Sequence, residues 1–151
     1  MRIIAGPCQH ESLEQSLEIA GHCKDVCDKY EVEYYFKASF DKANRTSVHS
    51  KRGVGLYPTN FAFMDLKNQI SGLKILTDVH TVDHVRHLAY QGSGNSVDVL
   101  QIPAFLCRQT DLILEVCKTD KIVNIKKGQF MAPWDIKGIL SKTEKAKEVW
   151  I

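Results

Sequence analysis

Cations and small polar groups gather in the stretch KASFDKANRTS, which runs from Lys37 to Ser47. Its members are the cations Lys37, Lys42 and Arg45 and the polar residues Ser39, Asn44, Thr46 and Ser47. Ammonium and guanidinium groups beside hydroxyls and amides bind phosphates and carboxylates. The net charge is only +2, so attraction for anions must come from such local clusters. The stretch therefore indicates an anionic substrate with one or more phosphates.

Two further lysines, Lys126 and Lys127, follow the apolar run KIVNI. Clustered lysines are commonly solvated surface charges, and we favour that interpretation for Lys127 and Lys51. Lys37 and Lys126 come directly at the ends of apolar runs, where a functional role is favoured. A lysine there could bind an anion or form a Schiff base with a carbonyl substrate, as in aldolases, and the residues alone leave both open.

Asp78 and His80 follow another apolar run, LKILT. Residues two apart on a strand share a face, so this pair could serve as general acid and base or bind sugar hydroxyls. The structural alternative is an aspartate at a helix start with a histidine at the edge of the core. Gln101 and Asn124 lie near the ends of VDVLQIP and KIVNI in the same way.

The five cysteines form no evenly spaced disulfide framework, and no signal peptide precedes them. A reducing cytoplasm is therefore the expected setting. On spacing alone Cys8 is interpreted as a small inert residue, with metal ligand and nucleophile as alternatives. Cys23 and Cys27, one helical turn apart beside His22, could form half a metal site, but no second pair has matching spacing, so packing is favoured.

Composition describes an ordinary globular chain of 151 residues, with 44% hydrophobic and 25% charged residues. This length suits one domain, residues 1–151, with a sizeable core. The balanced charge argues against nucleic-acid and membrane partners. No apolar run approaches the roughly 20 residues of a membrane span.

Apolar periodicity predicts strands and helices in alternation. The predicted strands are 2–5, 32–36, 73–79, 97–102, 121–125 and the start of one at 149–151. The predicted helices are 12–30 (with Ser12 as N-cap), 61–70, 82–90, 110–118 and 133–147. We expect Gly6-Pro7 to end the first strand, the second helix to begin after Pro58-Thr59, and residues 91–96 to form a flexible loop. The alternation is typical of an α/β protein with a parallel sheet.

The polar candidates all fall at the C-terminal ends of successive predicted strands. This end is the usual position of an active site in a (β/α)8 barrel or an open α/β sheet.

Several segments, in the same order, carry a resemblance to a known family. They are IAGPC followed by ES, then KASFDKANRTSVHSKRGVGL, TDVH, QIPAFLCRQTDL and NIKKGQFMAPWD. From Ile3 to Ile151 the chain resembles the 3-deoxy-D-manno-octulosonate 8-phosphate synthases. The resemblance implies a (β/α)8 (TIM) barrel that condenses phosphoenolpyruvate with arabinose 5-phosphate and releases inorganic phosphate, a step toward bacterial lipopolysaccharide. It also implies a homo-oligomer when the protein is complete.

The resemblance assigns roles at matching positions. Lys37, Ser39, Lys42 and Lys126 match residues around phosphoenolpyruvate, in a pocket that Gln101 and Ala104 also line. Asn44, Arg45 and Thr46 match the sugar-phosphate segment, in which the family usually has serine at the Thr46 position. Asp78 and His80 match the segment near the reacting centre and, with Lys37 and Lys126, are the expected catalytic residues. These assignments make the lysines binders of charge without a Schiff base.

Cys8 matches the cysteine of the family's metal-dependent branch, which revises its interpretation to a ligand of a divalent metal ion. In the family the remaining ligands, a histidine, a glutamate and an aspartate, come later than Ile151, as does an arginine for phosphoenolpyruvate. A (β/α)8 barrel needs about 250 residues. We therefore expect an incomplete barrel, with strands 1–5 and the start of strand 6, that is inactive alone because its sheet is open.

Two departures from the family and two other functions stay open at this point. The segment QGSGN before the fourth strand looks inserted, and residues 57–60 disturb the start of the second helix. The related 3-deoxy-D-arabino-heptulosonate 7-phosphate synthase, which uses erythrose 4-phosphate, is one alternative, but KANRTS and QIPAFLCRQTD argue against it. A non-catalytic phosphate-binding or subunit-interaction protein is the other.

Overall fold

The computed structural model describes residues 1–90 and 96–151, and the QGSGN segment lies outside these residues. The described residues form two compact units. The first comprises Met1–Thr77 with Ser96 and Val97, and the second comprises Asp78–Tyr90 with Asp98–Ile151. The expectation of a single domain stays a prediction.

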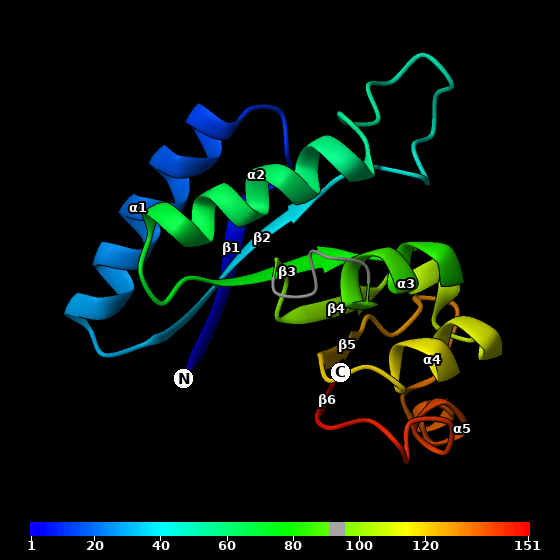
Figure 1. Ribbon diagram of the computed structural model, residues 1–151. Coiled ribbons are helices and arrows are strands. Elements are labelled where there is room, and N and C mark those ends of the chain that lie inside the picture. Colours follow the sequence, from blue (N-terminus) through cyan, green and yellow to red (C-terminus); the bar gives the residue numbers. More distant parts are fainter. Residues whose placement is uncertain (91–95) are drawn as a thin grey trace. The chain divides into compact units, whose positions relative to one another are not determined.

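The first unit contains parallel strands paired in chain order. They are β1 (Arg2–Gln9), β2 (Glu33–Ser39) and β3 (Lys74–Asp78), whose last residue belongs to the second unit. Two helices connect them, α1 (Leu13–Lys29) and α2 (Leu56–Gln69). Figure 1 shows α1 and α2 side by side, and α1 packs on β1 and β2. The loop between β2 and α2, drawn in cyan, extends beyond the end of the strand.

The second unit repeats the same plan. Its strands β4 (Val99–Ile102), β5 (Ile122–Ile125) and β6 (Val149–Trp150) pair in parallel and in chain order. Its helices are α3 (Val82–Tyr90), η1 (Ala104–Leu106), α4 (Thr110–Val116), η2 (Pro133–Asp135) and α5 (Ile136–Leu140). The α3 and α4 helices are joined by an ion pair in which Arg86 Nε lies 3.0 Å from Glu115 Oε1.

Strands buried on both faces supply the core of each unit. Phe36 and Ala38 of β2 and every residue of β4 are buried. Continuous apolar runs of this kind are expected in parallel strands that are covered on both sides. Each large side chain so buried contributes about 1.5–3 kcal/mol.

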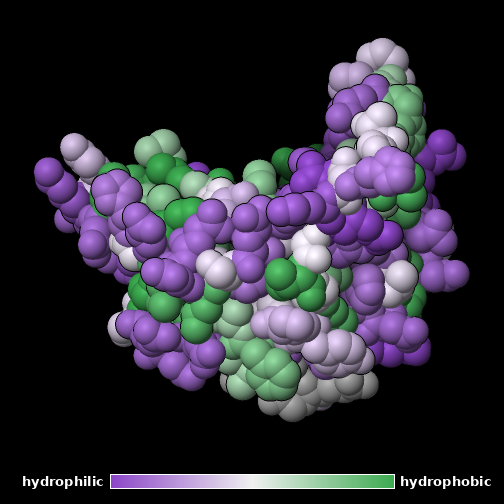
Figure 2. Space-filling view, turned by 90° about the horizontal axis from the view of Figure 1, so that it is seen from above, coloured by the Kyte–Doolittle hydropathy of each residue, from purple (hydrophilic) through white to green (hydrophobic). Residues whose placement is uncertain are grey.

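Parallel strands alternating with helices make this an α/β fold, and the order matches an incomplete (β/α)8 barrel. In the described part of the chain, no helix is long and apolar enough to cross a membrane. Large apolar side chains are also exposed, among them Ile4, Phe105, Phe130 and Trp134. Figure 2 shows hydrophobic and hydrophilic side chains intermixed over one face.

The first two strands differ from the sequence prediction. β1 does not end at Gly6-Pro7 but continues to Gln9, because its register shifts between Ala5 and Cys8. Two residues, Gly6 and Pro7, stand opposite one residue of β2 in this bulge, where a missing proline N–H is tolerated. β2 likewise extends to Ser39, so part of the cationic stretch is strand.

Two helices also differ. α2 begins at Leu56, so Pro58 lies in its first turn, where backbone N–H groups lack intrahelical partners in any case. The helix predicted over 133–147 is reduced to η2 and α5, which end at Leu140. Hydroxyl groups also bond to the last carbonyls: Ser141 Oγ donates to Gly138 O, and Thr143 Oγ1 donates to Leu140 O beside the Thr143 N–H. The remaining elements match within about two residues, and Ser12 caps α1 by accepting from the Gln15 N–H.

Candidate functional site

The bulge in β1 determines how the candidate residues at the ends of β1 and β2 are positioned. A Cβ on Gly6 would lie 2.1 Å from the Lys37 carbonyl oxygen, so only glycine allows the two backbones to come this close. After the bulge, Cys8 pairs with Ala38 and Gln9 pairs with Ser39. The ends of β1 and β2 are thereby locked together.

Two lysines converge on one hydroxyl at the end of β2. Lys37 Nζ lies 3.3 Å and Lys42 Nζ 2.9 Å from Ser39 Oγ. Ser39 is buried, and its carbonyl accepts from the backbone N–H of His10 at 3.0 Å. Two ammonium groups held beside one oxygen repel each other, and a bound anion would relieve that repulsion. We call Lys37, Ser39, Lys42, Asn44, Arg45 and Thr46 the cationic cluster.

The loop that carries the rest of this cluster is fixed at its base. The Lys42 N–H donates to Arg52 O at 2.6 Å, and Arg52 forms a two-pronged ion pair with Asp41. Gly53 has a φ of 123°, and a Cβ there would meet Phe40 O at 2.5 Å. Within this frame Asn44, Arg45 and Thr46 are exposed, as ligand-binding groups must be.

Gln9, the last residue of β1, and His10, which follows it, support the cluster, and the sequence prediction missed both. Arg45 Nη2 donates to Gln9 Oε1 at 3.1 Å and so ties the loop to the strand. His10 is buried, and its Nδ1 lies 2.9 Å from Ser16 Oγ. Burial lowers the pKa of His10, because it disfavours the charged imidazolium. Their position directly after an apolar strand beside Cys8 was the only signal in the sequence.

Cys8 is exposed and has a φ of 66°, an unusual value for a residue other than glycine. In residues 1–90 and 96–151, no three His, Cys, Asp or Glu side chains are grouped so as to hold a metal ion. A catalytic metal needs about three protein ligands. The described residues around Cys8 therefore do not form a metal site by themselves.

The second set of candidates belongs to the second unit and is built from amides. Gln101 Nε2 donates to Asp78 Oδ1, and Asn124 Nδ2 donates to Gln101 Oε1 at 2.8 Å. Asp78 and Gln101 are buried, and Gln101 and Asn124 are paired in register on β4 and β5. We call Asp78, Gln101 and Asn124 the amide cluster.

His80 lies half-buried between Asp78 and α3. Its backbone N–H donates to His84 Nδ1 at 3.3 Å, and the two rings meet edge to face with centroids 5.6 Å apart. His84, which the sequence prediction did not name, is itself held by the Thr81 hydroxyl, which accepts from its N–H. The TDVH segment is thus fixed by local contacts.

The two lysines after β5 have different surroundings. The Lys126 side chain is exposed, while its N–H donates to Ile102 O at 3.1 Å. The sequence predicted that Lys127 is a solvated surface charge, and this prediction is wrong. Lys127 is half-buried and donates to the carbonyls of Gly128 and Met131. Ala104 is half-buried in η1.

A comparison with protein families gives a match to the model of the DAHP synthetase I family over residues 1–148. The chain belongs to the DAHP synthetase I family. Proteins named 2-dehydro-3-deoxyphosphooctonate aldolase are similar to it. That of Brucella anthropi is 51% identical over 140 residues, which are 93% of this chain and 48% of the relative. That of Chelativorans sp. is 51% identical over 142 residues, 94% of this chain and 49% of the relative.

A third relative of that name, from Bartonella henselae, is 51% identical over 93% of this chain. The chain spans about half the length of the curated relatives it matches. The family name refers to the 3-deoxy-D-arabino-heptulosonate 7-phosphate synthase, which the sequence analysis kept as an alternative. The individual relatives, in contrast, carry the name of the octulosonate enzyme.

Other features of this family member involve residues outside both clusters. A groove of about 420 Å³ in the second unit is lined by Arg108, Phe130, Met131, Asp135, Gly138, Ile139 and Lys142. These lining residues include no member of either cluster. Cys27 is buried and Cys23 half-buried on α1, in keeping with packing positions.

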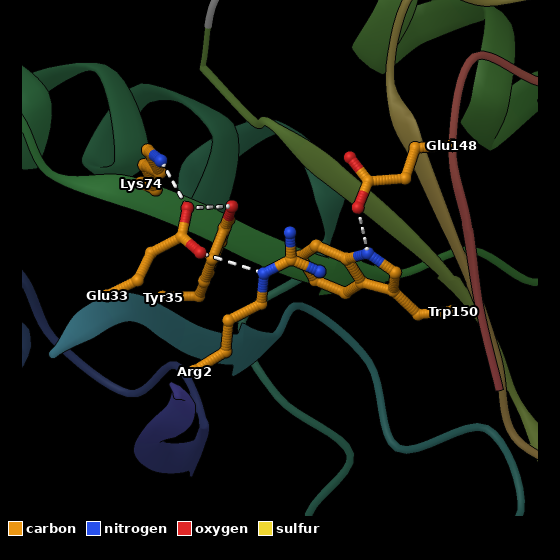
Figure 3. Close-up of polar contacts among 6 residues, drawn as sticks. All are labelled: Arg2, Glu33, Tyr35, Lys74, Glu148 and Trp150. Atoms are coloured by element: carbon orange, nitrogen blue, oxygen red, sulfur yellow. Dashed lines mark hydrogen bonds and ion pairs between the residues drawn. The ribbon is translucent and has the colours of Figure 1, made fainter.

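A charged cluster also occupies the opposite ends of β1, β2 and β3 (Figure 3). Glu33 Oε2 lies 2.8 Å from Arg2 Nε, and Glu33 Oε1 lies 2.6 Å from Lys74 Nζ and 2.8 Å from the Tyr35 hydroxyl. Hydrogen bonds from Lys74, Arg2 and Tyr35 lower the pKa of Glu33 to about 2. We call these four residues the strand-start cluster. It connects the strands at the end remote from the cationic cluster.

Proposed function

We propose that this chain forms part of a 3-deoxy-D-manno-octulosonate 8-phosphate synthase, which condenses phosphoenolpyruvate with arabinose 5-phosphate. The observation that carries the proposal is 51% identity over 93% of the chain to relatives named for that product. The cationic cluster supports it independently, since two phosphates and a carboxylate have to be held close together. Two like charges about 6 Å apart repel by about 3 kcal/mol at an effective dielectric of about 20, so fixed cations are needed.

The cationic cluster divides between the two substrates in this proposal. Lys37, Ser39 and Lys42 bind phosphoenolpyruvate, and the convergence of both ammonium groups on Ser39 Oγ supports a shared anion there. Asn44, Arg45 and Thr46 bind the phosphate of the sugar, and their exposure on the loop leaves them accessible. The lysines bind charge and form no Schiff base.

The residues of the second unit act on the reacting groups. The enol carbon of phosphoenolpyruvate attacks the sugar aldehyde, water adds to the adjacent carbon, and inorganic phosphate leaves. Asp78 and His80 accept and return protons or hold sugar hydroxyls, while Lys126, Gln101 and Ala104 contact phosphoenolpyruvate. Polar groups that already point at the charge formed in the transition state stabilise it most, because they need not reorganise during the reaction.

Cys8 is the proposed protein ligand of a divalent metal that would orient water or the aldehyde. The described residues supply no further ligands around it, so the steps given above are those of this chain's own side chains. The proposal extends to a homo-oligomeric state of the complete enzyme.

The test is release of inorganic phosphate from phosphoenolpyruvate with either arabinose 5-phosphate or erythrose 4-phosphate. It is made with the 151-residue chain and with a chain extended by downstream coding sequence, each with Mn²⁺ or EDTA. Release that requires arabinose 5-phosphate and the extended chain supports the proposal. Preference for erythrose 4-phosphate would assign the related heptulosonate enzyme. Binding of phosphoenolpyruvate without turnover in either chain would favour a non-catalytic phosphate-binding protein.

A further inference from the structure

Two arginines in the loop between β2 and α2 differ in the groups that hold them. Arg52 forms a two-pronged ion pair with the carboxylate of Asp41, at 2.8 Å from its Nε. Arg45 Nη2 instead donates to the amide oxygen Gln9 Oε1 at 3.1 Å. Within residues 1–90 and 96–151, no carboxylate is paired with Arg45. A carboxylate compensates the charge of a guanidinium that it binds, whereas a neutral amide leaves that charge uncompensated.

The β1 bulge determines where this amide lies. Because β1 has one extra residue between Ala5 and Cys8, Gln9 is paired with Ser39, on whose hydroxyl Lys37 and Lys42 converge. Gln9 is 8% exposed, whereas Arg45, which follows it by 36 residues, is exposed on the loop. The end of a paired strand therefore holds the guanidinium group beside the cationic cluster.

The Gln9 amide also stands between Arg45 and a carboxylate. A guanidinium has only donors, so Gln9 must turn its oxygen toward Arg45. Its NH2 group faces Glu11, with Nε2 3.4 Å from Glu11 Oε1, which is a long contact. A carboxylate bonded directly to Arg45 would compete with a phosphate for the same N–H groups. The amide anchors the arginine and does not compete in this way.

We propose that Gln9 is a positioning residue that holds Arg45 in place for a phosphate group and leaves the positive charge of Arg45 uncompensated. A guanidinium carries five N–H donors, and Gln9 accepts from one of them, so the others serve a two-pronged contact with phosphate oxygens. The ligand class is a phosphate or a phosphate monoester. Its identity as the phosphate of the sugar rests on the proposed function, whereas the binding of phosphate by Arg45 does not.

An exchange of two neighbouring side chains, Gln9→Glu together with Glu11→Gln, tests the proposal. It moves a carboxylate onto Arg45 and keeps the net charge of the chain constant, so the arginine is still anchored but its charge is compensated. We expect the affinity of the 151-residue chain for inorganic phosphate, measured by NMR titration, to fall about tenfold or more, as for the loss of one charged hydrogen bond. Glu11→Gln alone is the matched control, and it should not lower the affinity, since it only removes a negative charge.

Two further comparisons separate this role from a purely structural one. In an Arg45→Met background the exchange should change the affinity for phosphate only slightly, because the group that it compensates is absent. Gln9→Leu removes the anchor but leaves the charge of Arg45 free to bind, so its affinity should fall less than that of the exchanged chain. Urea denaturation shows whether each variant is folded. If the exchanged chain does not fold, the decision passes to Gln9→Leu, whose fall in affinity should disappear in the Arg45→Met background.

The proposal is overturned if the folded, exchanged chain binds phosphate as tightly as the wild type. It is also overturned if the affinity falls equally in the Arg45→Met background, or if the wild-type chain does not bind phosphate. Failure of the proposed synthase gives a different result. In that case turnover of phosphoenolpyruvate with arabinose 5-phosphate is absent, while the effects of the exchange on the binding of inorganic phosphate persist.

Discussion

The two sets of candidate residues hold polar groups in different ways. In the cationic cluster, charged side chains extend from a strand end and an exposed loop, and Lys37 and Lys42 share one neutral hydroxyl. In the amide cluster, Gln101 and Asn124 stand in strand register and connect to one carboxylate through directed hydrogen bonds. The cationic cluster concentrates positive charge, whereas the amide cluster fixes the direction of its hydrogen bonds.

The difference corresponds to two tasks in the proposed reaction. Phosphates are bound by charge that tolerates small displacements, so lysines on a loop suffice. Proton transfer requires a defined atom at a defined position, so its residues belong on rigid elements with supporting hydrogen bonds. Variants that affect only one of the two sets can separate these tasks.

The largest expected effect comes from Gly6→Ala, which would break the frame of the cationic cluster. The new methyl group would lie 2.1 Å from Lys37 O, so β1 and β2 would have to separate at the bulge. We expect a loss of about 3 kcal/mol or more in the free energy of unfolding, measured by urea denaturation.

Gly21→Ala is the matched control for that substitution. Gly21 lies in α1, and a Cβ there meets nothing within 4 Å. Alanine should stabilise the helix by about 0.5–1 kcal/mol. Equal urea midpoints for the Gly6 variant and the wild type would show that the bulge is soft and that it does not hold the cluster in place.

The next effect concerns the binding of anions. Lys42→Met removes one of the two ammonium groups beside Ser39 Oγ, and a charged hydrogen bond contributes about 1.5–3 kcal/mol. The affinity for phosphoenolpyruvate, measured by calorimetry, should fall about tenfold or more. The wild-type affinity should also decrease as salt is raised, because exposed charges are screened.

Lys51→Met is the control, since Lys51 is an exposed lysine of the same loop. Its loss should change the affinity only slightly. If Lys42→Met and Lys51→Met weakened binding equally, the loop would act as a diffuse positive charge, and the contrast between the two clusters would be lost.

Sequence periodicity was sufficient to place most strands and helices. Apolar runs such as KIVNI were separated by turn residues, and polar side chains followed each run. Position at a strand end thus pointed to Lys37, Asp78 and Gln101 before any geometry was known. The cationic stretch was visible because charge density is a local property of the sequence.

Features that depend on a partner strand could not be predicted. Gly6-Pro7 has the sequence of a strand end, and only the approach of Lys37 O explains why the chain continues through a bulge. The hydrogen bond between Asn124 and Gln101 depends in the same way on strand register, since the two residues are 23 positions apart in the sequence. At the early end of α5, the Ser141 and Thr143 hydroxyls bond to helix carbonyls, and apolar periodicity does not predict such contacts.

The smallest expected effect concerns the strand-start cluster, which shows whether charge also stabilises the first unit away from its candidate site. The folded pKa of Glu33, about 2, lies below its ordinary value of 4.5, so the folded state binds this proton less readily than the unfolded state. The resulting stability is present above about pH 4.5 and is lost as the pH falls toward 2. Because 34% of the side chain is exposed, solvent screening limits the contribution to about 1 kcal/mol.

Glu33→Gln should therefore lower the free energy of unfolding by about 1 kcal/mol at neutral pH and flatten its decline between about pH 4.5 and pH 2. Glu115→Gln provides the comparison in the second unit, where hydrogen bonds from Lys118 and Arg86 lower the pKa of Glu115. Parallel stability curves for wild type and Glu33→Gln over this range would mean that the cluster of Arg2, Glu33, Tyr35 and Lys74 adds nothing to folding. In that case the contrast between the cationic cluster and the amide cluster would concern ligand binding alone.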